Sequence, residues 1–294
     1  ERKRMSSPIY VSRNLPISNV LDGVLLGSIG LPDLQRPFVW KNDKVRDLLD
    51  SMLRGYPIGY IMLWDSPNDL ETKSQHIGTN EKAYAAPKSL VIDGQQRLTA
   101  LLASLYGVEV KDKNYNTRKI RIAYDPLTRV FKNADATTDR DSRFVSSVAD
   151  VFSAKKENRL RSFRREFSSV LNESKEKKGE TPLTDEELDA IDNGLDELLS
   201  LESYQLPILD IMASADEEMV SDIFVRVNSQ GQTLKQDDFI MTLLSVYEPE
   251  MRNSIETFCA NSHIPSNGSS YNPLVVVSPT HVIRTAVGVG FKRG

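Results

Sequence analysis

The stretch Val91–Leu98, with the sequence VIDGQQRL, joins a short apolar run to a helical pattern through a glycine. A strand that runs into such a turn and directly into a helix leaves the first backbone N–H groups of the helix unpaired and pointing at one place. The helix dipole adds positive charge there, so the place attracts a phosphate group. Gly94 would let the backbone approach the phosphate, and Arg97 would supply a planar charged fork. The pattern predicts a phosphate site at residues 93–97.

The other polar residues of this stretch fit hydrolysis of the bound phosphate. Asp93 could hold a metal-bound water or polarise an attacking one, Gln95 or Gln96 could orient that water, and Thr99 adds a hydroxyl one turn later. A plainer interpretation makes Asp93 and Gln96 a capping box, but it leaves Gln95 and Arg97 without a role. The G-x-x-x-x-G-K-[ST] pattern of a Walker A loop is absent.

A second polar pair lies in Leu31–Trp40, with the sequence LPDLQRPFVW. Two prolines bracket Gln35 and Arg36 and favour a stiff extended loop. Both side chains can make bidentate contacts with base edges or phosphate, so we expect them to bind DNA. Phe38 and Trp40, at strand spacing, are expected to enter the core.

A third stretch, Phe224–Phe239, places Arg226 and Asn228 before a turn at Gly231 and Asp238 at the start of a further helix. In a purely structural interpretation Asn228 ends one helix, Gly231 forms the turn and Asp237 or Asp238 interacts with a helix dipole. That interpretation leaves only Arg226 unexplained.

Six basic residues crowd into the segment from Lys155 to Arg165, with the sequence KKENRLRSFRR. Such a run can be a solvated helix face, or it can contact a phosphate backbone with a steep dependence of affinity on salt. In the second interpretation the DNA contacts are Lys155, Lys156, Arg161, Arg164 and Arg165.

The elements that must position these residues alternate in the first half of the chain. Apolar spacing predicts helices at 17–29, 42–53 and 95–106, with Asn42 or Asp43 as the cap of the second, and extended segments at 58–64, 89–92 and 119–124. The segment 66–87 is a polar loop without periodicity.

The second half is mainly helical. Helices are expected at 144–152, 157–171, 185–201, 216–227 and 235–259, a charged linker at 172–182, and a strand at 204–211. Thr184 and Glu187 form a capping box before the third of these helices. The fold class is therefore α+β. We expect an α/β nucleotide-binding core at 1–130, a helical extension at 131–260 that folds back on it, and a linker with the truncated start of a further region at 261–294.

Composition excludes several classes of protein. The chain has 294 residues, 39% of them hydrophobic, and no apolar stretch that suggests a membrane span or a signal peptide. The single cysteine, Cys259, excludes an internal disulfide and a cysteine-based zinc site, and three scattered histidines argue against a histidine-rich metal centre. We expect a cytoplasmic protein without a membrane partner. The net charge of −4 argues against a uniformly basic surface.

Taken together and in this order, LPDLQRPFVW, VIDGQQRLTAL and FVRVNSQGQTLKQDDF resemble the N-terminal domain of the GmrSD-type restriction proteins over about residues 15–248. The D-G-Q-Q-R motif at Asp93–Arg97 is complete. In the first motif Leu34 stands where the family commonly has an aromatic residue, so a stacking role is not expected there.

The resemblance implies a ParB/sulfiredoxin-like core, a small mixed sheet with helices, that works in prokaryotic defence against foreign DNA. It implies that Asp93, Gln95, Gln96 and Arg97 form a nucleotide and catalytic site, with Arg226, Asn228 and Asp238 folded beside it. Cleavage in such proteins usually belongs to an HNH-type nuclease domain, which nothing in this sequence matches. We therefore expect the chain to be one half of a larger protein or one subunit of a two-part system.

The leading hypothesis is a nucleoside triphosphatase, assisted by Mg2+, that couples hydrolysis to recognition of foreign DNA, modified or unmodified. The main alternative is a nucleotide-gated DNA-binding module with negligible hydrolysis. A third hypothesis, in which the D-G-Q-Q-R site itself cuts DNA, ranks last because the site has few carboxylates to hold two metal ions.

Overall fold

The computed structural model of the chain describes residues 8–31, 38–65, 87–112, 116–228, 240–241, 244, 248–266 and 271–291. Gln35, Arg36, Gly231 and Asp238 lie outside these residues. The expected loop at 66–87 lies outside them as well, except for Pro87.

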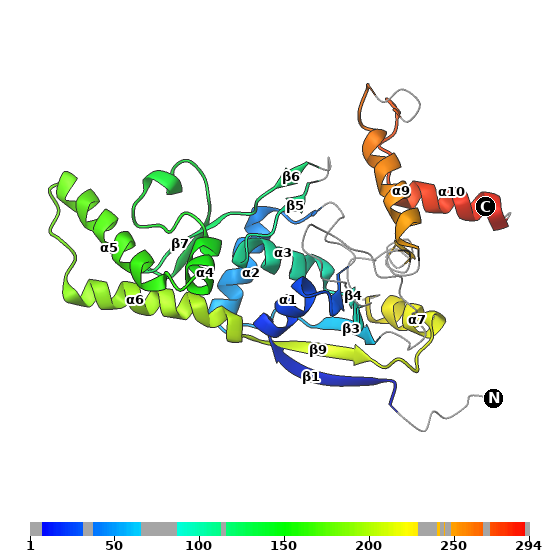
Figure 1. Cartoon of the computed structure of the whole chain (residues 1–294), viewed down its shortest axis with the longest axis horizontal. Helices are drawn as coiled ribbons and strands as arrows, with labels where there is room; N and C mark the ends of the chain where they lie inside the picture. The colour runs from blue at the N-terminus through cyan, green and yellow to red at the C-terminus, as the bar shows by residue number, and fades with distance from the viewer. Residues whose placement is uncertain are drawn as a thin grey trace.

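A mixed five-stranded sheet forms the centre of the molecule (Figure 1). Its strand order is β1-β9-β3-β4-β2, in which β9 is antiparallel to β1 and parallel to β3, while β4 is antiparallel to β3 and parallel to β2. The strands are β1 (Tyr10–Pro16), β2 (Ile29–Gly30), β3 (Ile61–Asp65), β4 (Ser89–Asp93) and β9 (Gln205–Ile211). The strand predicted at 204–211 thus lies inside the sheet, between segments from the first half of the chain.

The two faces of the sheet bury alternate side chains of its central strands. Ile61, Leu63 and Val91 join the large core beneath α1, α2 and α3, whereas Met62 and Trp64 join a smaller cluster with Val220 and Phe224 of α7. The helices are α1 (Ile17–Leu25), α2 (Asn42–Leu53), α3 (Gln95–Leu105) and α7 (Glu217–Asn228). This period-2 alternation makes the core a sheet covered on both faces, which explains why β3 and β4 are almost continuously apolar.

A mainly helical extension continues from α3. Small strand pairs come first, and a long α5–α6 hairpin projects at the end of the molecule away from α7 (Figure 1). The elements are β5 (Val110–Lys111), β6 (Thr117–Arg118), β7 (Ile122–Asp125), β8 (Val130–Asn133), α4 (Val148–Lys156), α5 (Leu160–Lys177) and α6 (Asp185–Leu199), with short 3-10 turns at Thr138–Arg140 and Ser200–Ser203. Two further helices, α9 (Pro249–Asn261) and α10 (Pro279–Phe291), follow near the C-terminus.

The predicted α+β class, a small mixed sheet followed by a helical extension, is confirmed. The capping box is also confirmed, because the Thr184 hydroxyl accepts from the Glu187 amide while the Glu187 carboxylate accepts from the Thr184 amide. The boundary predicted at residue 130 stays a prediction.

Several boundaries were wrong. The predicted linker at 172–182 is helical through Lys177, because the partly buried Lys175 holds it against Glu187. Lys41, rather than Asn42 or Asp43, is the N-cap residue of α2. The first helix ends at Leu25, and Ile29 then joins the sheet.

Candidate functional site

The turn between β4 and α3 is built by Gly94. This residue is the N-cap of α3 and has a left-handed backbone, with φ 89°, and no side chain caps the helix. A Cβ atom at position 94 would overlap the Ile61 side chain and come within 3.4 Å of the Tyr60 carbonyl oxygen. Only glycine fits both the conformation and the space. The capping box of Asp93 and Gln96 was therefore wrong, since the chain turns at Gly94.

Arg97 points back from the first turn of α3 to the segment before β3. Its Nη1 donates a 2.6 Å hydrogen bond to the Tyr60 carbonyl. Gly59, with φ +87°, lies against the same guanidinium, and a Cβ atom there would be 2.9 Å from Nη2. Among the described residues the Tyr60 carbonyl is the hydrogen-bond acceptor of this side chain, so the other N–H groups of the fork remain for a ligand.

Burial and charge act on the titratable groups around this turn. Burial lowers the pKa of Arg97, although the neighbouring Asp93 partly opposes the shift. Burial raises the pKa of Asp93, and the Gly94 amide and Arg97 oppose it. The pKa of Tyr60 is raised by burial and by the Asp93 charge. The turn thus holds a cation and a carboxyl group in partly desolvated surroundings, where electrostatic interactions are strong.

The two glutamines face different surroundings. Gln95 is 9% exposed, and its Nε2 donates to the Val91 carbonyl at 2.8 Å. The half-buried Gln96 accepts a 3.2 Å hydrogen bond from the Val39 amide through Oε1. Gln95 thus joins α3 to β4. Gln96 joins α3 to Val39, which follows Gln35 and Arg36 in the sequence. Thr99 is 1% exposed, and its hydroxyl has no hydrogen-bond partner within the described part of the chain.

The sequence analysis missed Gly59 and Tyr60 as parts of this site. A signal was present, because Gly55 and Gly59 flank Pro57 directly before a buried strand. Gly55, which follows α2, has a φ of +70°, as is typical of a glycine after a helix.

Comparison with known proteins decides the family. The sequence family described as "GmrSD restriction endonuclease, N-terminal domain" matches residues 17–245. The chain belongs to this family. The match covers most of the chain, including all three motifs of this GmrSD domain. The chain is also 33% identical over 94 residues to "Uncharacterized protein MJ0686" of Methanocaldococcus jannaschii. The aligned region covers 30% of this chain and 16% of the length of that relative.

The third motif of the GmrSD domain begins on α7, on the face of the sheet opposite to α3. Arg226 is exposed, and its Nε donates a 2.9 Å hydrogen bond to the Asp222 carboxylate. The Arg226 side chain also takes part in a further interaction. Asn228 is the last residue of α7. Placement of these residues beside Arg97 stays a prediction, because the segment that follows α7 lies outside the described residues.

In the first motif, Phe38 is buried as predicted, and Trp40 packs partly buried against the large core, although neither lies in a strand. The hydrogen bond from Val39 to Gln96 joins this end of the loop to the Gly94 turn.

The predicted basic run of the GmrSD domain spans α4 and α5, and several of its charges have intramolecular partners. Lys155 pairs with Glu202, and Lys156 lies over the Tyr106 ring at 3.4 Å from its centroid. Arg164 bonds Asp192 and Asp196 of α6. Arg161 and Arg165 are exposed, with no ion pair to other described residues. Tyr106 follows the C-terminal end of α3, so Lys156 lies at the opposite end of that helix from Gly94.

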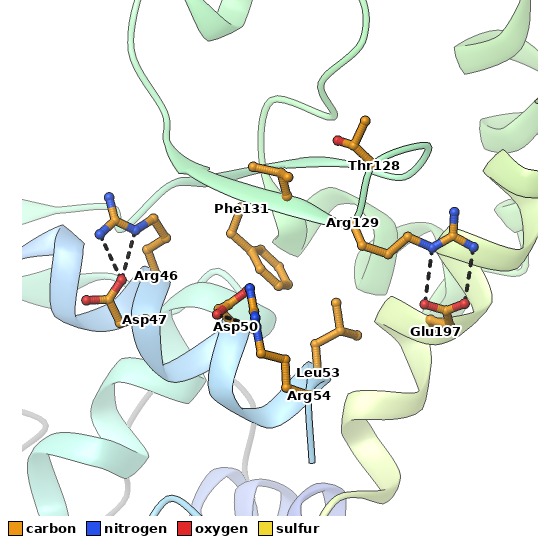
Figure 2. A pocket seen from close by; sticks show the side chains of 10 residues that line it. Arg46, Asp47, Asp50, Leu53, Arg54, Thr128, Arg129, Phe131 and Glu197 are labelled. Atoms are coloured by element: carbon orange, nitrogen blue, oxygen red, sulfur yellow. Dashed lines mark hydrogen bonds and ion pairs between the residues drawn. The ribbon is translucent and has the colours of Figure 1, made fainter. Parts of the chain in front are cut away.

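Two cavities lined by described residues hold clusters of charged side chains, and neither includes the Gly94 turn. The larger, about 480 Å3, lies between α2 and the β7–β8 hairpin (Figure 2). Within the described ranges no group of three or more His, Cys, Asp or Glu side chains could hold a metal ion. None of the helices there is both long and apolar enough to cross a membrane.

Proposed function

We propose that this GmrSD domain binds and hydrolyses a nucleoside triphosphate at the Gly94 turn, and that hydrolysis couples recognition of DNA to cleavage by a separate HNH-type nuclease domain. The observation that carries the proposal is the position of Arg97. Its partly buried guanidinium is fixed by the Tyr60 carbonyl beside the uncapped N-terminus of α3. Backbone N–H groups and an arginine fork that converge in this way favour a phosphate group.

Each polar residue of the turn has a role in this proposal. Arg97 and the first amides of α3 hold the terminal phosphates, and Gly94 lets them approach. Asp93 polarises the attacking water, and Gln96, whose Nε2 is not used in its bond to Val39, orients it. Gln95 is a positioning residue, because its amide is bonded to Val91. Thr99, which is buried, packs beneath the first turn of α3.

The residues at the turn fit a magnesium ion that arrives with the triphosphate. Mg2+ keeps several waters and commonly binds through one or two carboxylates together with substrate phosphates. Asp93 is the carboxylate that the described part of the turn offers. When bound, the ion would neutralise charge that develops on the phosphates.

The remaining contacts belong to the same proposal. Arg226, Asn228, Gly231 and Asp238 would close the nucleotide site from the third motif. The DNA would contact Gln35 and Arg36 of the proline loop, together with Lys155, Lys156, Arg161, Arg164 and Arg165. Arg161 and Arg165 are the strongest members of the second group, because their charges are not paired with other described residues.

One observation favours the alternative of a nucleotide-gated DNA-binding module without hydrolysis. Among described residues the turn offers a single carboxyl group, Asp93, and burial raises its pKa. One carboxyl group, whose burial disfavours the charged form, supports Mg2+ and an attacking water less well than a pair of exposed carboxylates would.

Phosphate release from each of the four ribonucleoside triphosphates with Mg2+, with and without DNA, tests the proposal. We expect DNA-stimulated release that falls at least about 100-fold in Arg97→Ala, and a large loss in Arg97→Lys, which keeps the charge but not the fork. Arg54→Ala, which removes an exposed arginine paired with Asp50 on α2, is the control and keeps full release. Triphosphate binding without release would establish the gated module instead.

A further inference from the structure

A second cavity of about 410 Å3 lies at the base of the α5–α6 hairpin. Its walls come from the turn after β7, the loop around residues 137–143, the C-terminal half of α5 and the segment that leads to α6. We call it the basic pocket, because Arg140, Arg143, Lys175 and Lys178 line it. It shares no residue with the Gly94 turn.

The positive charge of the basic pocket exceeds its negative charge. Among the lining residues that the structure describes, four cations face two carboxylates, Asp141 and Glu180, which leaves an excess of two positive charges. Arg143 is bonded to Asp141 at 2.6 Å, and Lys175 is bonded to Glu187 at 3.3 Å.

The other two cations are less engaged. Arg140 and Lys178 make no ion pair within the described residues, although the charge of Lys178 helps to lower the pKa of Asp141. Arg140 and Lys178 are both exposed, so a ligand that enters the pocket can reach their side chains.

The cavity in Figure 2, unlike the basic pocket, is lined by equal numbers of cations and carboxylates. Three arginines and three carboxylates line it, and each arginine is paired: Arg46 with Asp47, Arg54 with Asp50, and Arg129 with Glu197. Its charges are satisfied within the chain. An anion would have to break an ion pair there, whereas the basic pocket offers cations that are still available.

Part of the basic pocket is apolar. Leu127, Leu171 and Leu183 line it together with the charged side chains, and Leu171 is 6% exposed. An apolar lining with a few polar groups, in a cavity of this volume, is typical of sites for small organic ligands. The hydroxyl of Ser142, which also lines the pocket, has no hydrogen-bond partner among the described residues.

We propose that the basic pocket binds a nucleotide unit, with its phosphate between Arg140 and Lys178 and its sugar or base against the three leucines. The unit can come from a free nucleotide or from a nucleic acid strand, and the phosphate chemistry is the same in both. The partial negative charge at the C-terminus of α5 opposes binding, but the four cations that line the pocket outweigh it. The proposal does not depend on hydrolysis at the Gly94 turn.

The test uses the full chain and two probes, dAMP in calorimetric titration and a fluorescent 16-mer duplex in anisotropy titrations at several salt concentrations. The pocket variant is Arg140→Glu with Lys178→Glu, and the milder Arg140→Gln with Lys178→Gln guards against a folding defect. The matched control is Lys119→Glu with Lys177→Glu, which makes the same charge change at exposed lysines outside the pocket. Arg97→Ala separates this site from the Gly94 turn.

We expect both pocket variants to lose about tenfold in affinity for each lost phosphate contact, also in the Arg97→Ala background that removes binding at the Gly94 turn, while the control stays within about twofold of the parent. Loss of dAMP binding alone identifies a free nucleotide as the ligand. Loss of duplex binding, with a salt slope lower by about 1.8, identifies the backbone of a strand. The proposal is overturned if the parent binds neither probe, if the pocket variants keep both affinities, or if the control loses as much as they do.

Discussion

Gly59 and Arg97 lie so close that a Cβ atom on residue 59 would be 2.9 Å from Nη2 of Arg97. The two residues belong to different elements, the segment before β3 and the first turn of α3. The absent side chain at position 59 therefore leaves room for the guanidinium to reach the Tyr60 carbonyl.

Gly59→Ala should displace Arg97 and weaken triphosphate binding about tenfold or more, because the lost contact is a charged hydrogen bond. The substitution also strains a backbone with φ +87°. Gly55→Ala is the matched control, since Gly55 has φ +70° and no atom within 4 Å of an added Cβ. Both variants should lose roughly 1 kcal/mol of folding free energy, and only Gly59→Ala should lose affinity in calorimetric titration with a triphosphate. Equal affinities would remove Arg97 from the phosphate site.

Asp93 should make the stability of the domain fall as pH rises. Burial raises the pKa of its carboxyl group in the folded chain above the ordinary value of 3.8, so the folded chain binds this proton more strongly than the unfolded chain. This contribution to stability is fully present below pH 3.8 and is lost as pH rises through the raised pKa. Asp93→Asn, which stays neutral, should therefore match the parent in Tm near pH 4 and exceed it at pH 7.

Thermal unfolding across this pH range checks the sign. Asp189→Asn, at an exposed aspartate of α6 without an ion pair in the described chain, should follow the parent at every pH. A lower Tm for Asp93→Asn at pH 7 would mean that attraction to Arg97 outweighs the cost of burial.

The sequence predicted what depends on local pattern. Helix α3, strand β4 and the capping box at Thr184 appear where apolar spacing and cap residues placed them. The role of Tyr60 could not be predicted, because it lies 37 residues before Arg97 in the sequence and its carbonyl meets Arg97 only after β3 and β4 pair. Likewise, nothing local reveals that Asp192 and Asp196 neutralise Arg164, since the pairing depends on how α5 and α6 pack.

Gly194, inside α6, should tolerate no side chain. An added Cβ atom would overlap the carbonyl of Pro126, and Tyr124 donates a 3.0 Å hydrogen bond to the Gly194 carbonyl at the same contact. Gly194→Ala should lower the free energy of unfolding by about 1–3 kcal/mol, because overpacking outweighs the better helix propensity of alanine. Gly290→Ala changes a helical glycine with no atom within 4 Å of the added Cβ. It should leave stability unchanged or raise it by up to about 1 kcal/mol. Urea unfolding measures both, and a neutral Gly194→Ala would show that α6 can shift away from Pro126.

Arg161 and Arg165 provide the sharpest test of DNA contact by the basic run. Both are exposed on α5, whereas Arg164 is held by α6. Arg161→Glu with Arg165→Glu should weaken duplex DNA binding and lower the slope of log affinity against log salt by about 1.8, as expected for two lost phosphate contacts. Anisotropy titrations at several salt concentrations give both quantities. Lys119→Glu with Lys177→Glu changes the net charge equally and should keep the slope of the parent. If the α5 variant keeps that slope too, the run is a solvated helix face, and the DNA contacts of this GmrSD domain lie elsewhere on the chain.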